Sequence, residues 1–162
     1  MTDAPDPQLP RSAAASFPGR VSAGTAVCVG LSSFRGSIDP GQEPPVDAWQ
    51  DLHYAGSVTR DLAAALGDLG FACTVYAEKD LPTAQELGSC ISESLTAAPS
   101  SGSHVVHVLS HGHPGMSGLY VVGADGRWAE STKVESWVAS IEDDPGQLRA
   151  HTLFLIDTCY SG

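Results

Sequence analysis

Basic residues are scarce in this 162-residue sequence, which has 8 Lys and Arg against 19 Asp and Glu and a formal net charge of −11. Nucleic acids and anionic membrane surfaces both require a positively charged protein face. We therefore expect neither of them as the main partner, and a cationic substrate or partner suits the sequence better. The length and the 42% apolar content are those of one ordinary globular domain rather than a fibrous or membrane-spanning chain.

Paired cysteines and a secretory signal are also lacking. The four cysteines, at positions 28, 73, 90 and 159, form no Cys-x-x-Cys pair. Three of them, Cys28, Cys73 and Cys90, lie inside apolar segments, where they resemble small core residues. This pattern indicates neither a disulfide framework nor a zinc knuckle. The first residues contain no basic region followed by an apolar core. These features predict a cytoplasmic protein with reduced thiols.

Apolar patterns divide the sequence into a leader and one folded domain. Residues 1–22 are rich in Pro, Ala and Ser and have too little apolar area to offset the entropy of ordering, so we expect a flexible leader. Residues 23–162 alternate short β-branched runs with segments of helical period. The predicted elements are a strand at 25–31, a helix at 57–69, a strand at 71–77, a helix at 84–98, a strand at 104–110, a hairpin pairing 119–122 with 127–128, a helix from Thr132 to near Pro145, and a strand at 152–156. This order predicts an α/β fold with a mostly parallel sheet and helices on both faces.

Several local signals support these elements. In the first helix, Ser57 can form the cap, Val58 and Leu62 begin the apolar face, and Gly70 can end the helix in a left-handed conformation. The second and third helices each follow a Thr-x-x-Glu sequence with capping-box spacing, at 83–86 and 132–135. The Gly- and Pro-rich segment 32–51 is a long loop, and loops of that length in compact domains are usually functional or mobile.

The last apolar run leads into a polar cluster. A short run of branched and aromatic residues is typical of a strand buried on both faces of a parallel sheet. Asp157, Thr158 and Cys159 would then lie at its carboxyl end, where ligand crevices form in open α/β sheets. The competing interpretation is that Cys159 simply packs in the core, as most lone cysteines do.

A second strand end carries His111. If the helix between the two strands makes an ordinary crossover, His111 and Cys159 lie on adjacent or nearby strands at the same sheet edge. An adjacent imidazole lowers the pKa of a thiol and later protonates a leaving amine. Gly112 has no Cβ, so its N–H can approach a developing oxyanion closely, and the Cys159 N–H would be the second donor.

These motifs resemble those of the caspase-like cysteine peptidases, and most closely their metacaspase and bacterial branch. Ser110-His111-Gly112 ends one strand and residues 157–162, Asp-Thr-Cys-Tyr-Ser-Gly, end the next, and Cys159 lies 48 positions after His111. The resemblance covers residues 25–162 and implies a three-layer caspase-like sandwich that cleaves peptide bonds with a His111/Cys159 dyad. It also implies an oxyanion hole that includes Gly112, and an Asp157 carboxylate that faces a basic side chain before the scissile bond.

The sequence also departs from the family pattern. Ser57-Val58 stands where that branch commonly has Asn-Asp, so one expected pocket carboxylate is missing, and Arg35 could favour an acidic substrate side chain instead. We assign Asp157, Arg35 and Ser110 to substrate binding and leave basic against acidic specificity open. The resemblance allows calcium dependence, but the sequence identifies no calcium ligands and we expect no cofactor.

The sequence stops three residues after Cys159, whereas the family fold continues with further strands. We therefore expect this chain to be the large-subunit portion of a C-terminally incomplete domain. Its partners would be a protein or peptide substrate and either the missing small-subunit part or another copy of itself.

Two other functions compete with peptidase activity. Four histidines, at positions 104, 107, 111 and 113, suggest a metal site. However, side chains alternate along a strand, which places His104 and His107 on opposite faces of the sheet. The stronger rival is a non-catalytic interaction or regulatory module with the same fold, because one fold can host binding as well as catalysis.

Overall fold

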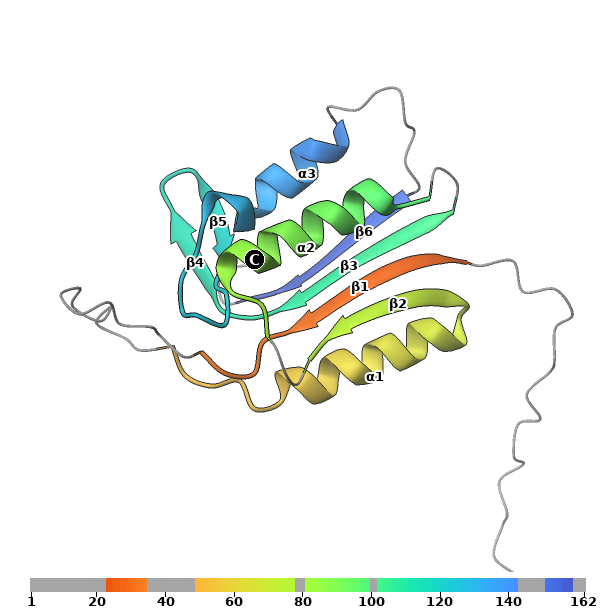
Figure 1. Ribbon diagram of the computed structural model, residues 1–162, viewed down its shortest axis with the longest axis horizontal. Coiled ribbons are helices and arrows are strands. Elements are labelled where there is room, and N and C mark those ends of the chain that lie inside the picture. The colour runs from red at the N-terminus through yellow and green to blue at the C-terminus, as the bar shows by residue number, and fades with distance from the viewer. Residues whose placement is uncertain (1–22, 35–48, 78–80, 100–101, 143–150, 159–162) are drawn as a thin grey trace, which may run out of the picture.

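A computed structural model describes residues 23–34, 49–77, 81–99, 102–142 and 151–158 of the chain. The predicted leader, residues 1–22, lies outside the described residues. Figure 1 shows an α/β arrangement whose elements are β1 (Gly24–Gly30), α1 (Ala55–Asp68), β2 (Phe71–Tyr76), α2 (Ala84–Ala97), β3 (Ser103–Leu109), β4 (Gly112–Gly115), β5 (Gly118–Val121), a 3-10 helix η1 (Glu130–Thr132), α3 (Val134–Glu142) and β6 (His151–Asp157). Within these residues no helix has the length and apolar character needed to cross a membrane.

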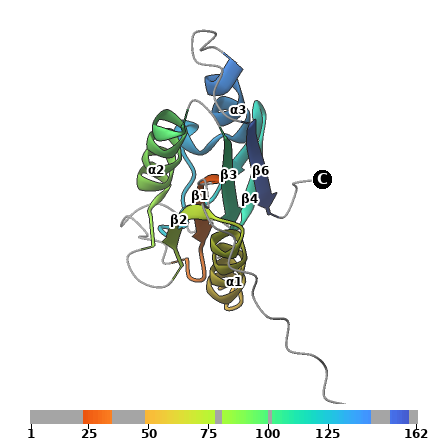
Figure 2. The same cartoon turned by 90° about the vertical axis from the view of Figure 1, so that its right-hand side faces the viewer.

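Four parallel strands form the main sheet, in the order β2-β1-β3-β6. Each parallel connection needs a helix-sized crossover, which explains the alternation of strands and helices along the chain. Helix α1 covers one face, and α2 and α3 lie on the other (Figure 2). The small antiparallel hairpin β4–β5 extends from the carboxyl end of β3.

The two faces of the sheet support cores of unequal size. Successive residues of a strand point to opposite faces, so each strand contributes to both cores. The larger core lies under α2 and α3 and contains Val27, Val29, Val106, Val108, Leu87, Ile91 and Trp137. The smaller core lies under α1 and contains Ala26, Cys28, Ala63 and Val105.

The predicted start of α2 is confirmed. Thr83 Oγ1 accepts a hydrogen bond from the Glu86 N–H at 3.3 Å, and the Glu86 carboxylate accepts one from the Thr83 N–H at 2.9 Å. The Thr83 N–H and the Thr83 hydroxyl both donate to the Glu86 carboxylate, and these two bonds hold the pKa of Glu86 below its ordinary value. The predicted apolar face is also confirmed, because Leu87, Ile91 and Leu95 are buried.

Helix α1 differs from the prediction at its start and on its buried face. It begins at Ala55, and the Ser57 hydroxyl donates to the Tyr54 carbonyl instead of capping a backbone N–H. Val58, predicted to face the core, is 43% exposed, and the buried residues are Ala55, Gly56, Thr59 and Ala63. The cause is a close approach to the sheet, since a Cβ at Gly30 would lie only 2.3 Å from Thr59 Oγ1. Small side chains therefore occupy this face. Gly70 ends the helix as predicted, with a φ of 94°.

The hairpin prediction named the wrong partner strand. Residues 118–121 pair with Gly112–Gly115, across a turn at Met116-Ser117, and not with 127–128. Residues 123–127 form a separate turn that is closed by a hydrogen bond from the Gly123 N–H to the Arg127 carbonyl, 2.8 Å long. Alternating apolar residues around a Gly-rich turn could not distinguish these two pairings.

The capping box predicted for α3 is also wrong. Thr132 lies in η1, where its hydroxyl is hydrogen-bonded to the backbone of Ala129. The Glu135 carboxylate instead accepts a hydrogen bond from the Leu119 N–H at 3.2 Å. Glu135 therefore joins α3 to the hairpin. Its spacing of three residues from Thr132 matches a capping box, but its carboxylate makes a tertiary contact instead.

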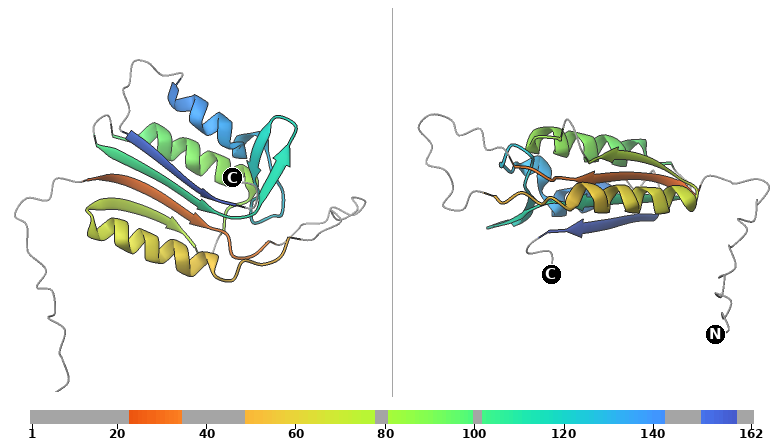
Figure 3. Two further views of the ribbon diagram at one scale, coloured as in Figure 1. Left: turned by 180° about the vertical axis from the view of Figure 1, so that it is seen from behind. Right: turned by 90° about the horizontal axis from the view of Figure 1, so that it is seen from below.

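Strand β6 is not buried on both faces, as the apolar run predicted. Its residues alternate in exposure: Leu153 is 53% and Leu155 is 37% exposed, whereas Phe154 and Ile156 pack toward the larger core. Figure 3 shows α1 running along β1 and β2, to the side of β6. Within the part of the chain that the structure describes, β6 pairs only with β3 and forms one edge of the sheet.

Candidate functional site

The two predicted motif strands end side by side. Leu109 of β3 is in register with Asp157 of β6, and the Ser110 N–H donates to the Asp157 carbonyl at 3.2 Å. The expectation that these strands are neighbours is therefore confirmed. Cys159 and Arg35 fall outside the described residues, so their roles remain predictions.

Gly112 lies directly against the residue that precedes Cys159. A Cβ added at Gly112 would be 2.9 Å from Thr158 Oγ1 and 3.0 Å from Thr158 Cβ. Only glycine allows this approach without displacing Thr158, because ordinary contacts between carbon atoms are about 3.5–4.0 Å long. The backbone after β3 and the backbone after β6 therefore meet at Gly112 and Thr158.

The hairpin pairing sets the direction of the Gly112 N–H. Gly112 is opposite Val121, and the Val122 N–H donates to the His111 carbonyl at 2.9 Å. In an antiparallel ladder, this bond identifies Gly112 and Val121 as a non-hydrogen-bonded pair. The Gly112 N–H therefore points away from β5 and is not used by the hairpin ladder.

The His111 ring is held by a carbonyl and two aromatic rings. His111 Nε2 lies 2.7 Å from the Gln50 carbonyl oxygen. The centroid of the Phe34 ring lies 4.6 Å from that of the His111 ring, with an angle of 56° between the ring planes. The Trp49 ring stacks on His111 with a centroid distance of 5.0 Å and an interplanar angle of 30°. Because a carbonyl can only accept, Nε2 must carry the hydrogen. In the neutral ring Nδ1 is then the basic nitrogen.

The aromatic partners of His111 are themselves anchored. The Trp49 Nε1–H donates to the Gly126 carbonyl at 3.0 Å, and the Phe34 N–H donates to the Asp51 carboxylate at 3.1 Å. Sequence reasoning missed all of these contacts. The only signals were the expectation that a loop as long as 32–51 is functional or mobile, and the aromatic residues within it.

The structure uses Ser110 within the fold and leaves Asp157 accessible. Ser110 is buried, and its hydroxyl donates to the Val122 carbonyl at 2.7 Å, which ties β3 to the hairpin. Asp157 is exposed at the end of β6. His107 is in register with Leu155, and Asp157 lies two residues further along β6, so His107 and Asp157 are on the same face of the sheet. Burial lowers the pKa of His107, and the Asp157 carboxylate opposes that shift.

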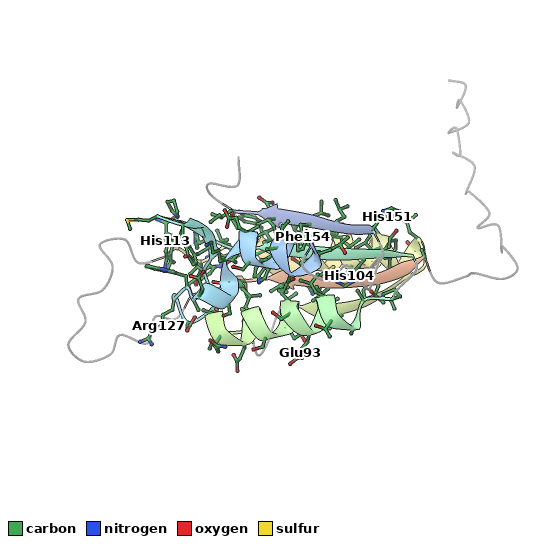
Figure 4. All side chains as sticks on the ribbon, turned by 90° about the horizontal axis from the view of Figure 1, so that it is seen from above. Glu93, His104, His113, Arg127, His151 and Phe154 are labelled. Atoms are coloured by element: carbon green, nitrogen blue, oxygen red, sulfur yellow. The ribbon has the colours of Figure 1, made fainter. Side chains whose placement is uncertain are left out.

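The four histidines do not converge. His104 is buried between the hydroxyls of Thr25 and Ser94, at 2.8 and 3.1 Å, while His113 stacks on Trp128 with ring centroids 3.8 Å apart. Figure 4 shows His113 at the hairpin end of the molecule, away from His104. Across the described ranges, no group of three or more His, Cys, Asp or Glu side chains could hold a metal ion.

The three described cysteines are free thiols in unreactive surroundings. Burial raises the pKa of Cys28 to about 11, and burial also raises the pKa of Cys73 and of Cys90. A thiol reacts as its thiolate, so none of these three suits a nucleophilic role.

No protein-family model matches the chain, and a search of curated proteins finds no match to it.

Proposed function

We propose that this protein is a Cys-dependent endopeptidase of the caspase-like type, with Cys159 as nucleophile and His111 as general base and acid. The observation that carries the proposal is the meeting of the β3 and β6 ends. His111 is held by Gln50 beside Gly112, and Gly112 contacts Thr158, the residue that precedes Cys159.

The fixed tautomer of His111 suits this chemistry. With Nε2–H bonded to the Gln50 carbonyl, Nδ1 accepts the Cys159 thiol proton. The thiolate then attacks the substrate carbonyl carbon, a C–S bond forms, and the C–N bond breaks as His111 returns the proton to the leaving amine. Water hydrolyses the resulting thioester and restores the thiol.

The outward Gly112 N–H supplies electrostatic stabilisation. Together with the Cys159 N–H it would donate to the oxyanion that develops during attack. One such donor is typically worth about 10²–10³ in turnover. No side chain is required at position 112, and the contact with Thr158 excludes one.

The exposed Asp157 carboxylate supports cleavage after Arg or Lys. Arg can bind a carboxylate through two parallel hydrogen bonds, so it would be preferred over Lys. An acidic preference would instead indicate Arg35 as the pocket residue. A peptide library distinguishes these alternatives, and Asp157→Asn should impair cleavage of basic substrates far more than that of neutral ones.

Labelling of Cys159 with an acyloxymethyl-ketone inhibitor tests the function without requiring turnover. We expect Cys159 to be modified, Cys159→Ala to abolish labelling, and His111→Ala to slow it by about 10²-fold or more. The matched control is His113→Ala, because His113 stacks on Trp128 and has no role in the dyad. Full labelling in His111→Ala, or an inert Cys159, would favour the non-catalytic interaction module.

A further inference from the structure

The edge of the sheet opposite β6 borders a groove. Two cavities, of about 370 and 380 Å³, lie between β2 and α2. Tyr76, Cys90 and Glu93 line both cavities, so the two adjoin at these residues, where the Tyr76 side chain reaches Cys90. Their size is within the range of about 300–1,000 Å³ that is usual for ligand sites.

Small side chains on both walls create this space. Ala72 and Thr74 line it from β2, whereas the alternate residue Phe71 packs in the smaller core on the α1 side. Ser94 and Ala97 line it from α2. These short side chains leave room in the first cavity for a strand-shaped ligand beside β2, and Tyr76, which reaches Cys90, bounds that space at one end.

Strand β2 is the other edge strand of the sheet that the described strands form. Within the described residues it pairs only with β1. Natural edge strands usually carry Lys, Pro, a bulge or inward charges that prevent further pairing. The β2 sequence, Phe-Ala-Cys-Thr-Val-Tyr, contains no charge and no Pro. Six residues extend about 20 Å and can pair with a peptide of similar length.

The groove is acidic. Among the described residues, Glu93 is the only carboxylate that lines the first cavity, Glu86 joins it in the second, and no Lys or Arg lines either one. Burial lowers the pKa of His104, which also lines the first cavity, so this imidazole adds no positive charge near pH 7. The complementary ligand is therefore basic.

We propose that the β2–α2 groove binds an extended basic segment of another protein, which adds as a strand to β2 and places a Lys or Arg beside Glu93. Main-chain pairing would supply affinity, and the groove would select alternate side chains. This site is separate from the β3–β6 edge and does not depend on the peptidase proposal.

The test uses the full chain carrying Cys159→Ala, so that the probe cannot be cleaved. The probe is a fluorescent peptide, Thr-Val-Lys-Val-Arg-Val-Thr, and its counterpart has Glu in place of Lys and Arg. In anisotropy titrations we expect saturable binding of the basic peptide, weakened about tenfold or more by Glu93→Lys and by Ala97→Phe, which fills the groove. Asp61→Lys and Thr96→Phe make the same changes at exposed positions that line neither cavity and should alter affinity by less than about twofold.

Amide chemical shifts locate the bound peptide. Changes at Ala72, Thr74 and Tyr76 on titration would support the groove. The proposal is overturned if the basic peptide does not bind, if the acidic peptide binds equally well, or if Ala97→Phe binds as tightly as the parent. Concentration-dependent dimers that Ala97→Phe abolishes, without peptide binding, would assign the β2 edge to a second copy of the chain instead.

Discussion

Replacement of Gly112 by Ala tests the contact on which the candidate site depends. The new Cβ would lie 2.9 Å from Thr158 Oγ1 and 3.1 Å from Leu119 Cδ1, about half an ångström closer than an ordinary contact. Overpacking of this kind typically costs about 1–3 kcal/mol. At about 2–4 °C per kcal/mol for a chain of this size, the melting temperature should fall by about 2–12 °C. Because Thr158 precedes Cys159, inhibitor labelling of Cys159 should also slow.

Gly67→Ala is the matched control, with the opposite expected sign. Gly67 lies within α1, and a Cβ there meets no atom within 4 Å. Ala is favoured over Gly inside a helix by about 0.5–1 kcal/mol, so this variant should be more stable than the parent and label normally. Thermal unfolding of the two variants and the parent provides the comparison. If Gly112→Ala is as stable as Gly67→Ala, Gly112 and Thr158 are not in contact and the proposed arrangement is wrong.

Three further predictions concern the rest of the fold. Thr83→Ala removes the α2 cap and should lower the free energy of unfolding by about 1 kcal/mol in urea titrations; no measurable change would contradict the capping geometry. Burial lowers the pKa of His104 and of His107 below 6.5, so the unfolded chain binds protons that the folded chain does not. The free energy of unfolding should therefore be highest above about pH 7 and should fall as the pH drops through 6.5, by at most about 1.4 kcal/mol per pH unit for each His. Urea titrations at several pH values measure this dependence, and a free energy of unfolding that did not change with pH would refute the prediction. Replacement of the exposed Leu153 and Leu155 by Lys should leave the fold intact and reduce self-association in sedimentation experiments, and unchanged association would exclude this face.

Features set by near neighbours in the chain were predictable from the sequence. The Thr83–Glu86 box depends on a spacing of three residues, and the burial of Leu87 and Ile91 follows from the helical period. The position of His111 at a strand end was predictable for a similar reason, because an apolar run ends just before it.

Features set by distant contacts were not predictable. The buried face of α1 is set by the close approach of Thr59 to Gly30, and the helical period of apolar residues in the sequence does not predict this contact. Gln50 is 61 residues from His111, so their hydrogen bond depends on the path of a loop. Glu135 has the spacing of a cap, yet its carboxylate accepts from a strand that packs beside it. In α1 and at Glu135, a tertiary contact replaced the local interaction that the sequence favoured, and at His111 a tertiary contact formed that no local pattern predicted.

The edge position of β6 has a consequence for how permanently the candidate site is assembled. Strand β3 is bonded on both sides, whereas β6 is bonded only to β3 among the described strands, and alternate side chains of β6 are exposed. Elements with few buried contacts open locally at low free energy, so β6 amides should exchange with solvent sooner than β3 amides. Each opening would separate Thr158 from Gly112 while His111 stays in place. A molecule that binds only the closed form of β6 would shift this local equilibrium in proportion to its concentration and would thereby control how often the two halves of the site meet.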